Sequence, residues 1–165
     1  MDIEFARQIA KNHFGIDGSA TSLAGERNPN FLISSPTGQF VLKIHNSSEV
    51  PQIQIQETAL AALEKLANFQ APKTVPAASG ELLVDIGEGK FARMLTWIDG
   101  DLWSQSQNLG ERHKSQLGRL IATVDSKLAT VDCTNFRTTL DQPFGWNALQ
   151  AKDLIADIAL IQDAE

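Results

Sequence analysis

The chain has 165 residues, 42% of them hydrophobic and 21% charged, and a formal net charge of −6. This is the composition of an ordinary globular protein, and its Lys and Arg residues form no cluster that would attract DNA or RNA, so we expect no nucleic-acid partner. No apolar run approaches the roughly 18 residues of a membrane span, and the N-terminus does not read as a secretory signal, so we expect no membrane partner.

The cysteine and histidine content argues against disulfides and metal sites. The single Cys133 excludes an internal disulfide, and together with the lack of a signal it favours a cytoplasmic location. The three histidines are far apart in sequence and have no metal-ligand spacing, so we expect no metal site in this chain.

The first part of the chain alternates between helical and strand patterns. Turn sequences, such as GERNPN at 25–30 and GEGK at 87–90, separate the strands. The expected elements are a helix at 2–14, strands at 19–24, 31–35 and 39–45, a helix at 52–67, and strands at 81–86 and 91–98. This order predicts an α+β fold with a five-stranded antiparallel sheet and a helix between strands 3 and 4.

The second part of the chain, from about residue 109, is helical in pattern. Six apolar residues at helical spacing predict a long amphipathic helix: Leu117, Leu120, Ile121, Val124, Leu128 and Val131. A second group predicts a last helix: Leu149, Leu154, Ile155, Ile158 and Ile161. We therefore divide the chain into residues 1–98, a linker at 99–108, and the start of a helical domain at 109–165.

One pair of charged residues suggests chemistry. Lys43 lies inside the apolar strand sequence FVLKI, and Glu57 lies on the apolar side of the following helix, between Ile53 and Leu60. An unpaired buried carboxylate is costly, so Glu57 needs a partner, and Lys43 is the natural one. The pair is either a structural salt bridge or the arrangement by which the protein-kinase fold holds the phosphates of ATP. A third interpretation is that the Lys43 side chain extends along the apolar surface and places its amine in water.

The sequence resembles the N-terminal part of the aminoglycoside-phosphotransferase-like kinases, and within them the hydroxylysine-kinase-like branch. The resemblance covers nearly all of the chain and rests on the order and spacing of several segments rather than on one motif. These segments are 23–31, 38–46, 56–63, 93–100, 117–128 and 144–151. The resemblance implies a protein-kinase-like fold, with 1–98 as the nucleotide-binding N-lobe, 99–108 as the hinge, and 109–165 as the first helices of an incomplete, truncated C-lobe for the substrate.

The resemblance also implies roles for individual residues. The turn at 25–30 would lie over the phosphates, Lys43 would contact them, and Glu57 would orient Lys43. Leu95 would line the adenine pocket, with the carbonyl of Thr96 and the amide of Ile98 facing adenine; Trp97 is either a nucleotide contact or an ordinary packed aromatic. The implied nucleotide-binding residues are Gly25, Glu26, Arg27, Asn28, Asn30, Lys43, Glu57, Leu95, Thr96, Trp97 and Ile98. Pro29 departs from the family pattern and removes one backbone N–H from the turn.

The catalytic loop of the family is missing from the sequence. That loop has the pattern HxDxxxxN, and none of the three histidines is followed by an aspartate two positions on. No catalytic residue or metal ligand is therefore assigned, and we expect the chain to bind ATP without transferring phosphate. The full-length parent, which is fused to an aminotransferase in some proteins of this branch, would use ATP and Mg²⁺ to phosphorylate a hydroxyl group of an amino alcohol or hydroxy-amino acid.

Two other interpretations stay open. The chain is also compatible with a non-catalytic binding or scaffolding module that has kept a kinase-like fold, or with an unrelated α+β domain in which the Lys43–Glu57 pair is purely structural. We further expect apolar faces of the C-terminal helices, around Leu154, Ile155 and Ile158, to be uncovered and to pack on a second copy or on the first lobe.

Overall fold

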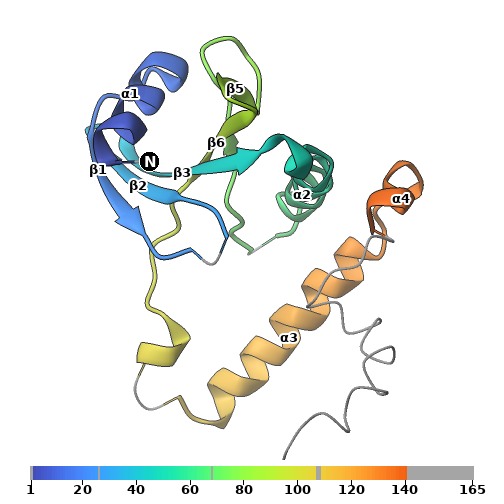
Figure 1. Ribbon diagram of the computed structural model, residues 1–165. Helices are drawn as coiled ribbons and strands as arrows, with labels where there is room; N and C mark the ends of the chain where they lie inside the picture. The colour runs from blue at the N-terminus through green and yellow to red at the C-terminus, as the bar shows by residue number, and fades with distance from the viewer. Residues whose placement is uncertain (1, 26, 68, 107–108, 141–165) are drawn as a thin grey trace, which may run out of the picture. The chain divides into compact units, whose positions relative to one another are not determined.

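The computed structural model describes residues 2–25, 27–67, 69–106 and 109–140 (Figure 1). By its internal contacts the chain divides into a large unit, residues 1–132, and a small unit, residues 133–165. The predicted last helix, and with it Leu154, Ile155 and Ile158, lies outside the described residues. The division into lobes at 99–108 stays a prediction.

The first helix, α1 (Ile3–Phe14), forms as its sequence predicts. The side chain of Asp2 accepts a hydrogen bond from the Phe5 N–H (2.8 Å) and so satisfies one of the free donors at the start of the helix. Gly15 ends the helix in the left-handed region, at φ 67°, where its N–H donates to the Lys11 carbonyl (3.1 Å).

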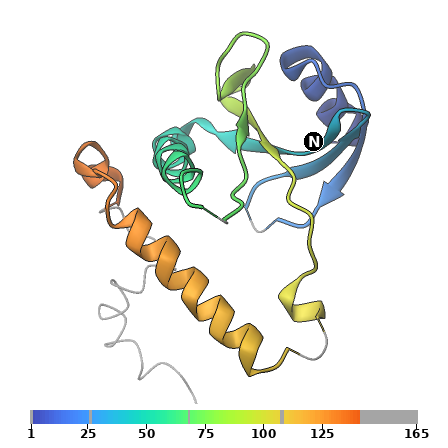
Figure 2. The same ribbon diagram turned by 180° about the vertical axis from the view of Figure 1, so that it is seen from behind.

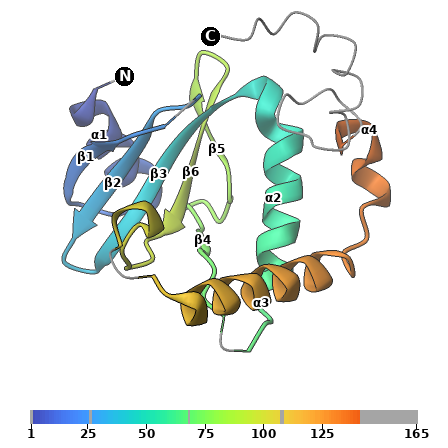
Figure 3. The ribbon, with the colours of Figure 1, turned by 90° about the horizontal axis from the view of Figure 1, so that it is seen from below.

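The sheet has six antiparallel strands (Figures 2 and 3). They are β1 (Ser19–Leu23), β2 (Asn30–Ser35), β3 (Gly38–Asn46), β4 (Thr74–Val75), β5 (Val84–Gly87) and β6 (Lys90–Thr96). The order across the sheet is β1-β2-β3-β6-β4, and β5 also pairs with β6. The five predicted strands are confirmed. The two-residue β4 was not predicted, because a strand this short between Pro72 and Pro76 has no period that a sequence can show.

The sheet presents an apolar face and a charged face. On the apolar face, Leu42 and Ile44 of β3 pack in one core with Ala6, Ile9 and Ala10 of α1. Leu42 is fully buried, as are Ile33 on β2 and Met94 on β6. Because side chains alternate along a strand, Lys43 and His45 point to the other face. The alternation alone left open which set is buried in the core, and the structure shows that it is Leu42 and Ile44.

The second helix, α2 (Val50–Leu63), lies between β3 and β4 in the chain and follows a short 3₁₀ turn, η1 (Ser47–Glu49). It begins two residues before the predicted 52–67 helix and ends four residues earlier. Pro51 occupies its first turn, where the missing N–H costs no hydrogen bond. Ile53 is buried and faces the protein interior.

The third helix, α3 (Glu111–Leu128), is confirmed as a helix and contacts α2. None of its residues is buried, and Leu117, Leu120 and Ile121 on its predicted apolar side are exposed. The remaining short elements are η2 (Trp103–Gln105), η3 (Thr134–Phe136) and α4 (Arg137–Leu140). Among the described residues, no helix is long and apolar enough to cross a membrane.

Replacing one leucine in the core and one leucine on α3 tests whether the core lies in the sheet and α3 lies outside it. Leu42→Ala empties a fully buried site, so we expect a loss of roughly 2–5 kcal/mol of unfolding free energy. Leu120→Ala removes a side chain that is 43% exposed, and we expect a loss below about 1 kcal/mol. Urea denaturation of the 165-residue chain measures both; equal losses would contradict the assignment of the core.

Candidate functional site

Three polar side chains form a row across the charged face of the sheet. In the strand register, Lys43 of β3 lies directly opposite Asn30 of β2 on one side and Arg93 of β6 on the other. Directly paired residues project to the same face of a sheet, so the three side chains share that face, with Lys43 in the centre. The row brings together two of the predicted site residues, Asn30 and Lys43, and adds Arg93.

The carboxylate of Glu57 contacts Arg93, and this corrects the predicted pairing with Lys43. The Nε atom of Arg93 lies 3.0 Å from Oε1 of Glu57, and its Nη1 donates to Oε1 of Gln56 (3.1 Å). The hydroxyl of Thr74 on β4 donates to the same Glu57 carboxylate, at 2.8 Å from Oε1 and 2.6 Å from Oε2. Among the described residues no ion pair joins Glu57 to Lys43.

The position of α2 explains why Arg93 takes the carboxylate. Thr74 belongs to β4, which pairs with β6 on the edge away from β3. Because Glu57 reaches both Thr74 and Arg93, its carboxylate lies over β6 and β4 rather than over β3. Sequence reasoning missed this arrangement because it depends on the strand register. One sequence feature could have indicated the Glu57–Arg93 pair: an arginine lies inside the apolar strand sequence FARML.

Lys43 is left as a half-buried cation. Burial, and next the positive charge of Arg93, lower the pKa of the Lys43 amine below its ordinary value. Within the described part of the chain, Lys43 takes part in none of the salt bridges. Two cations therefore stand side by side on this face, and the carboxylate of Glu57 pairs with Arg93 and not with Lys43. An anion placed at Lys43 would balance its charge.

The described residues of the predicted phosphate turn, 25 and 27–30, lie against β3. A Cβ atom on Gly25 would lie 2.4 Å from Nδ2 of Asn30 and 2.7 Å from the carbonyl oxygen of Asn28, so this position requires glycine. The carbonyl of Pro29 accepts a hydrogen bond from the N–H of Ile44 (3.1 Å). The turn therefore ends at Asn30, beside Lys43. Glu26 lies outside the described residues.

The Asn28 side chain joins this turn to the start of α2. Its Nδ2 atom lies 2.9 and 3.1 Å from the two carboxylate oxygens of Glu49 and 3.3 Å from Nδ1 of His45. The N–H of Asn46 also donates to Glu49 (2.8 Å). Sequence reasoning named Asn28 but missed Glu49 and His45, since these contacts join residues about 20 positions apart.

The charged groups of this cluster have displaced pKa values. Burial lowers the pKa of His45 from 6.5 to about 4; the charge of Glu49 opposes this shift, and those of Arg93 and Lys43 add to it. For Glu49, burial acts to raise the pKa, but hydrogen bonds from Asn46 and Asn28 and the nearby charges of His45 and Arg27 outweigh it, so the pKa is lowered. His45 is therefore neutral and Glu49 ionised at pH 7.

The predicted adenine segment, 95–98, continues from β6. The N–H groups of Thr96 and Trp97 donate to the carbonyls of Lys73 (2.9 Å) and Gln39 (3.0 Å). The Trp97 indole donates to Asp99 (3.0 Å). Outside the strand ladders, no backbone hydrogen bond of the described residues uses the N–H of Ile98 or the carbonyl of Thr96. These are the two groups that the resemblance assigns to adenine, and Leu95 before them is half-buried.

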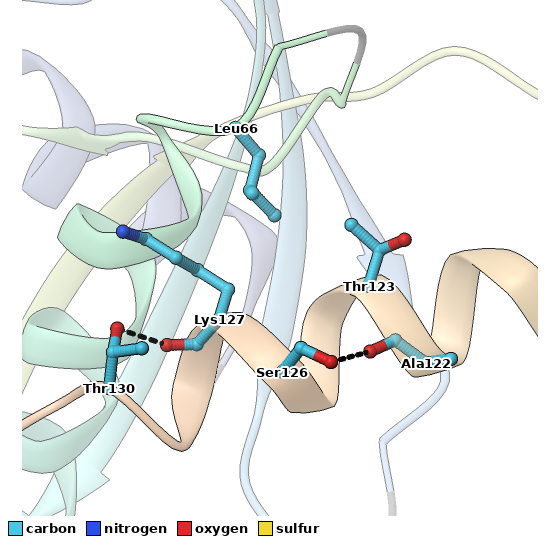
Figure 4. A pocket seen from close by; sticks show the side chains of 6 residues that line it. All are labelled: Leu66, Ala122, Thr123, Ser126, Lys127 and Thr130. Atoms are coloured by element: carbon cyan, nitrogen blue, oxygen red, sulfur yellow. Dashed lines mark hydrogen bonds between the residues drawn. The ribbon is translucent and has the colours of Figure 1, made fainter.

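Two other features lie apart from these residues. A pocket of about 450 Å³ between Leu66 and α3 contains none of the predicted site residues (Figure 4). It is lined by Leu66, Ala122, Thr123, Ser126, Lys127 and Thr130. Among the described residues, no group of three or more His, Cys, Asp or Glu side chains could hold a metal ion.

The comparison with known sequences finds a family match. Residues 20–162 match the sequence model of a phosphotransferase enzyme family. No curated protein matches the chain closely enough to count as a relative.

Solved structures of similar fold come from kinases. The fold is similar to that of a microcompartment-associated aminopropanol kinase, with a TM-score of 0.61 and 20% identity over 90% of this chain and 46% of that chain. A proposed aminoglycoside phosphotransferase from Ralstonia eutropha has a TM-score of 0.59 and 16% identity over 99% of this chain and 49% of that one. A spectinomycin phosphotransferase, solved with ADP and spectinomycin, has a TM-score of 0.50 and 18% identity over 72% and 36%.

These likenesses establish the predicted fold class. The chain has the protein-kinase-like α+β fold, with an antiparallel N-lobe and part of a helical C-lobe. The chain spans less than half of the length of each of these three solved structures.

Removing the charge of Glu57 tests the corrected ion pair. Glu57→Gln leaves the guanidinium of Arg93, which is 2% exposed, without a counter-charge, and we expect the unfolding free energy to fall by about 3 kcal/mol. The matched control is Glu64→Gln, which breaks an exposed pair with Lys73 and should cost about 0–1 kcal/mol. Similar losses in urea denaturation of the two variants would contradict the buried pair.

The lowered pKa of His45 predicts how stability depends on pH. Between pH 6.5 and 4 the unfolded chain binds a proton at His45 and the folded chain does not, so stability falls as the pH falls. Between pH 7.5 and 5 the loss at this group is about 2 kcal/mol. His45→Gln should remove this part of the slope in urea denaturation, with the wild-type chain as the reference. A slope that His45→Gln does not alter would refute the assignment.

Proposed function

The chain belongs to the phosphotransferase enzyme family, and from this we propose that it forms the ATP-binding part of a small-molecule kinase. The single observation that supports the proposal most is the half-buried amine of Lys43. The Arg93 guanidinium beside it already contacts Glu57 and Gln56, so the amine remains the cation that needs an anion. The α- and β-phosphates of ATP would supply that charge.

The surrounding residues support this placement of the nucleotide. The turn at 25–30 runs beside Lys43, and we assign Gly25, Glu26, Arg27, Asn28 and Asn30 to the phosphate side of the site. The segment 95–98 would hold the base, with the Thr96 carbonyl and the Ile98 amide facing adenine and with Leu95 and Trp97 beside it. Glu57 has an indirect role in this site, because its carboxylate pairs with Arg93 and not with Lys43.

The proposed reaction is phosphoryl transfer to an alcohol. The bond between the γ-phosphorus of ATP and the β–γ bridging oxygen breaks, and a bond from that phosphorus to the acceptor oxygen forms. The acceptor hydroxyl loses its proton, and ADP leaves. The fold similarity to an aminopropanol kinase supports an amino alcohol as acceptor. A hydroxy-amino acid presents the same pair of groups.

We propose that this 165-residue chain does not carry out the transfer by itself. Its sequence contains no His-x-Asp, so no residue is assigned to receive the proton of the acceptor. The described residues contain no group of three or more His, Cys, Asp or Glu side chains that could hold a metal ion, and we derive no step through the metal. The full-length protein would bind Mg²⁺ together with ATP. A cytoplasmic location fits the use of ATP.

Titration of the chain with ATP tests the proposal. We expect measurable binding to the wild type, and Lys43→Met should weaken it at least tenfold, a change of about 1.4 kcal/mol. The matched control is Lys114→Met, which removes an exposed lysine of α3 and should leave the affinity unchanged. Equal affinity of the wild type and Lys43→Met would refute the site.

Two further outcomes separate the alternatives. If the wild type shows no binding at millimolar ATP, and Lys43→Met changes only stability, the results favour the interpretation of the chain as a non-catalytic scaffolding module. If the chain phosphorylates 1-amino-2-propanol above background in a coupled ADP assay, the proposal that it is inactive alone is wrong.

A further inference from the structure

The contacts of Asn28 form a clamp between the 25–30 turn and the start of α2. The clamp consists of Asn28, His45 and Glu49, whose side chains meet at one amide group. The two hydrogens of Asn28 Nδ2 serve Glu49 on one side, at 2.9 and 3.1 Å, and Nδ1 of His45 on the other, at 3.3 Å. Both hydrogens of the amide nitrogen are therefore used inside the protein.

The protonation states of the clamp fit this arrangement. His45 is 6% exposed and neutral at pH 7, so its Nδ1 accepts from Asn28 and its Nε2 carries the hydrogen. Lys43 and Arg93 lie on the same face and disfavour a further positive charge on the ring. Glu49 is ionised and accepts from both Asn28 and the Asn46 N–H.

The clamp holds the turn where a phosphate would need it. Asn28 lies two residues before Asn30, which is directly opposite Lys43 in the sheet. The Pro29 carbonyl is held by the Ile44 N–H, so side chain and main chain both fix the turn against β3. Because Pro29 has no N–H, this turn has one fewer donor for an anion, and its order has to come from contacts within the protein.

We propose that Glu49 is a positioning residue of the nucleotide site: through Asn28 it holds the 25–30 turn in the conformation that receives the phosphates of ATP. The inference rests on the proposed function, because it assigns the turn to ATP. Asn28 contributes in the same way, since its side-chain amide is occupied by Glu49 and His45 and positions the backbone of the turn. An ordered turn binds with a smaller loss of conformational entropy.

A charge swap tests the clamp. Asn28→Asp places a second carboxylate against Glu49, and Glu49→Gln removes the charge that accepts from Asn28. The double variant Asn28→Asp/Glu49→Gln restores a carboxylate–amide hydrogen bond with its direction reversed. Asn28→Ala, at a half-exposed position, removes the contact without adding charge and serves if either single variant does not fold. Glu64→Gln, whose pair with Lys73 is exposed, is the control.

Two readouts are needed, and the first does not involve nucleotide. Trypsin cleaves after Arg27, inside the turn, so the rate of cleavage there reports how often the turn opens. We expect cleavage about tenfold faster in the single variants and in Asn28→Ala, because a hydrogen bond to a charged group is lost. The double variant and Glu64→Gln should be cleaved at the wild-type rate.

The second readout is the dissociation constant for ATP. It should rise about tenfold in the single variants and in Asn28→Ala, and return toward the wild-type value in the double variant. Faster cleavage at Arg27 with unchanged ATP affinity would overturn the inference and leave the proposed function intact. A wild type that binds no ATP would overturn both. Single variants that are cleaved like the wild type would refute the clamp itself.

Discussion

The buried guanidinium of Arg93 is the constraint on which the charged face of the sheet depends. A side chain of this charge, 2% exposed, must be compensated inside the protein, and Glu57 and Gln56 of α2 do so. Thr74 orients the same carboxylate from β4. The need to neutralise Arg93 therefore fixes the position of α2 over one half of the sheet, and it takes away the carboxylate that Lys43 would otherwise use.

Because Glu57 pairs with Arg93, the amine of Lys43 has an unbalanced charge. An amine with a buried carboxylate beside it would form a closed structural pair. Here the neighbour in the register is a second cation, which together with burial lowers the pKa of Lys43 and leaves its charge unbalanced. An incoming phosphate then gains the full attraction of the amine. The same arrangement explains how a buried ion pair, formed by Arg93 and Glu57, and a lysine with no ion pair among the described residues stand next to each other.

The sequence predicted much of the fold and only part of the site. Local patterns sufficed for α1, and the alternation along a strand separates Leu42 from Lys43. They did not suffice for β4, whose two residues have no period, or for the partner of Glu57, which follows from the register between β3 and β6. The Asn28–Glu49 contact was equally hidden, because hydrogen bonds between distant residues leave no trace in local spacing.

The segment from Lys43 to Glu57 connects these features, because it carries the amine that we propose for the phosphates, both acceptors of the clamp and the counter-charge of Arg93. Apart from that amine, these groups have their partners on other elements: Glu57 contacts Arg93 on β6 and Thr74 on β4, and Glu49 and His45 contact Asn28 in the turn before β2. One continuous strand–turn–helix segment thus sets the distances between groups that the rest of the chain brings to it. A shift of α2 along the sheet would move Glu49 and Glu57 together. It would therefore alter both the contact that holds the 25–30 turn and the ion pair of Arg93.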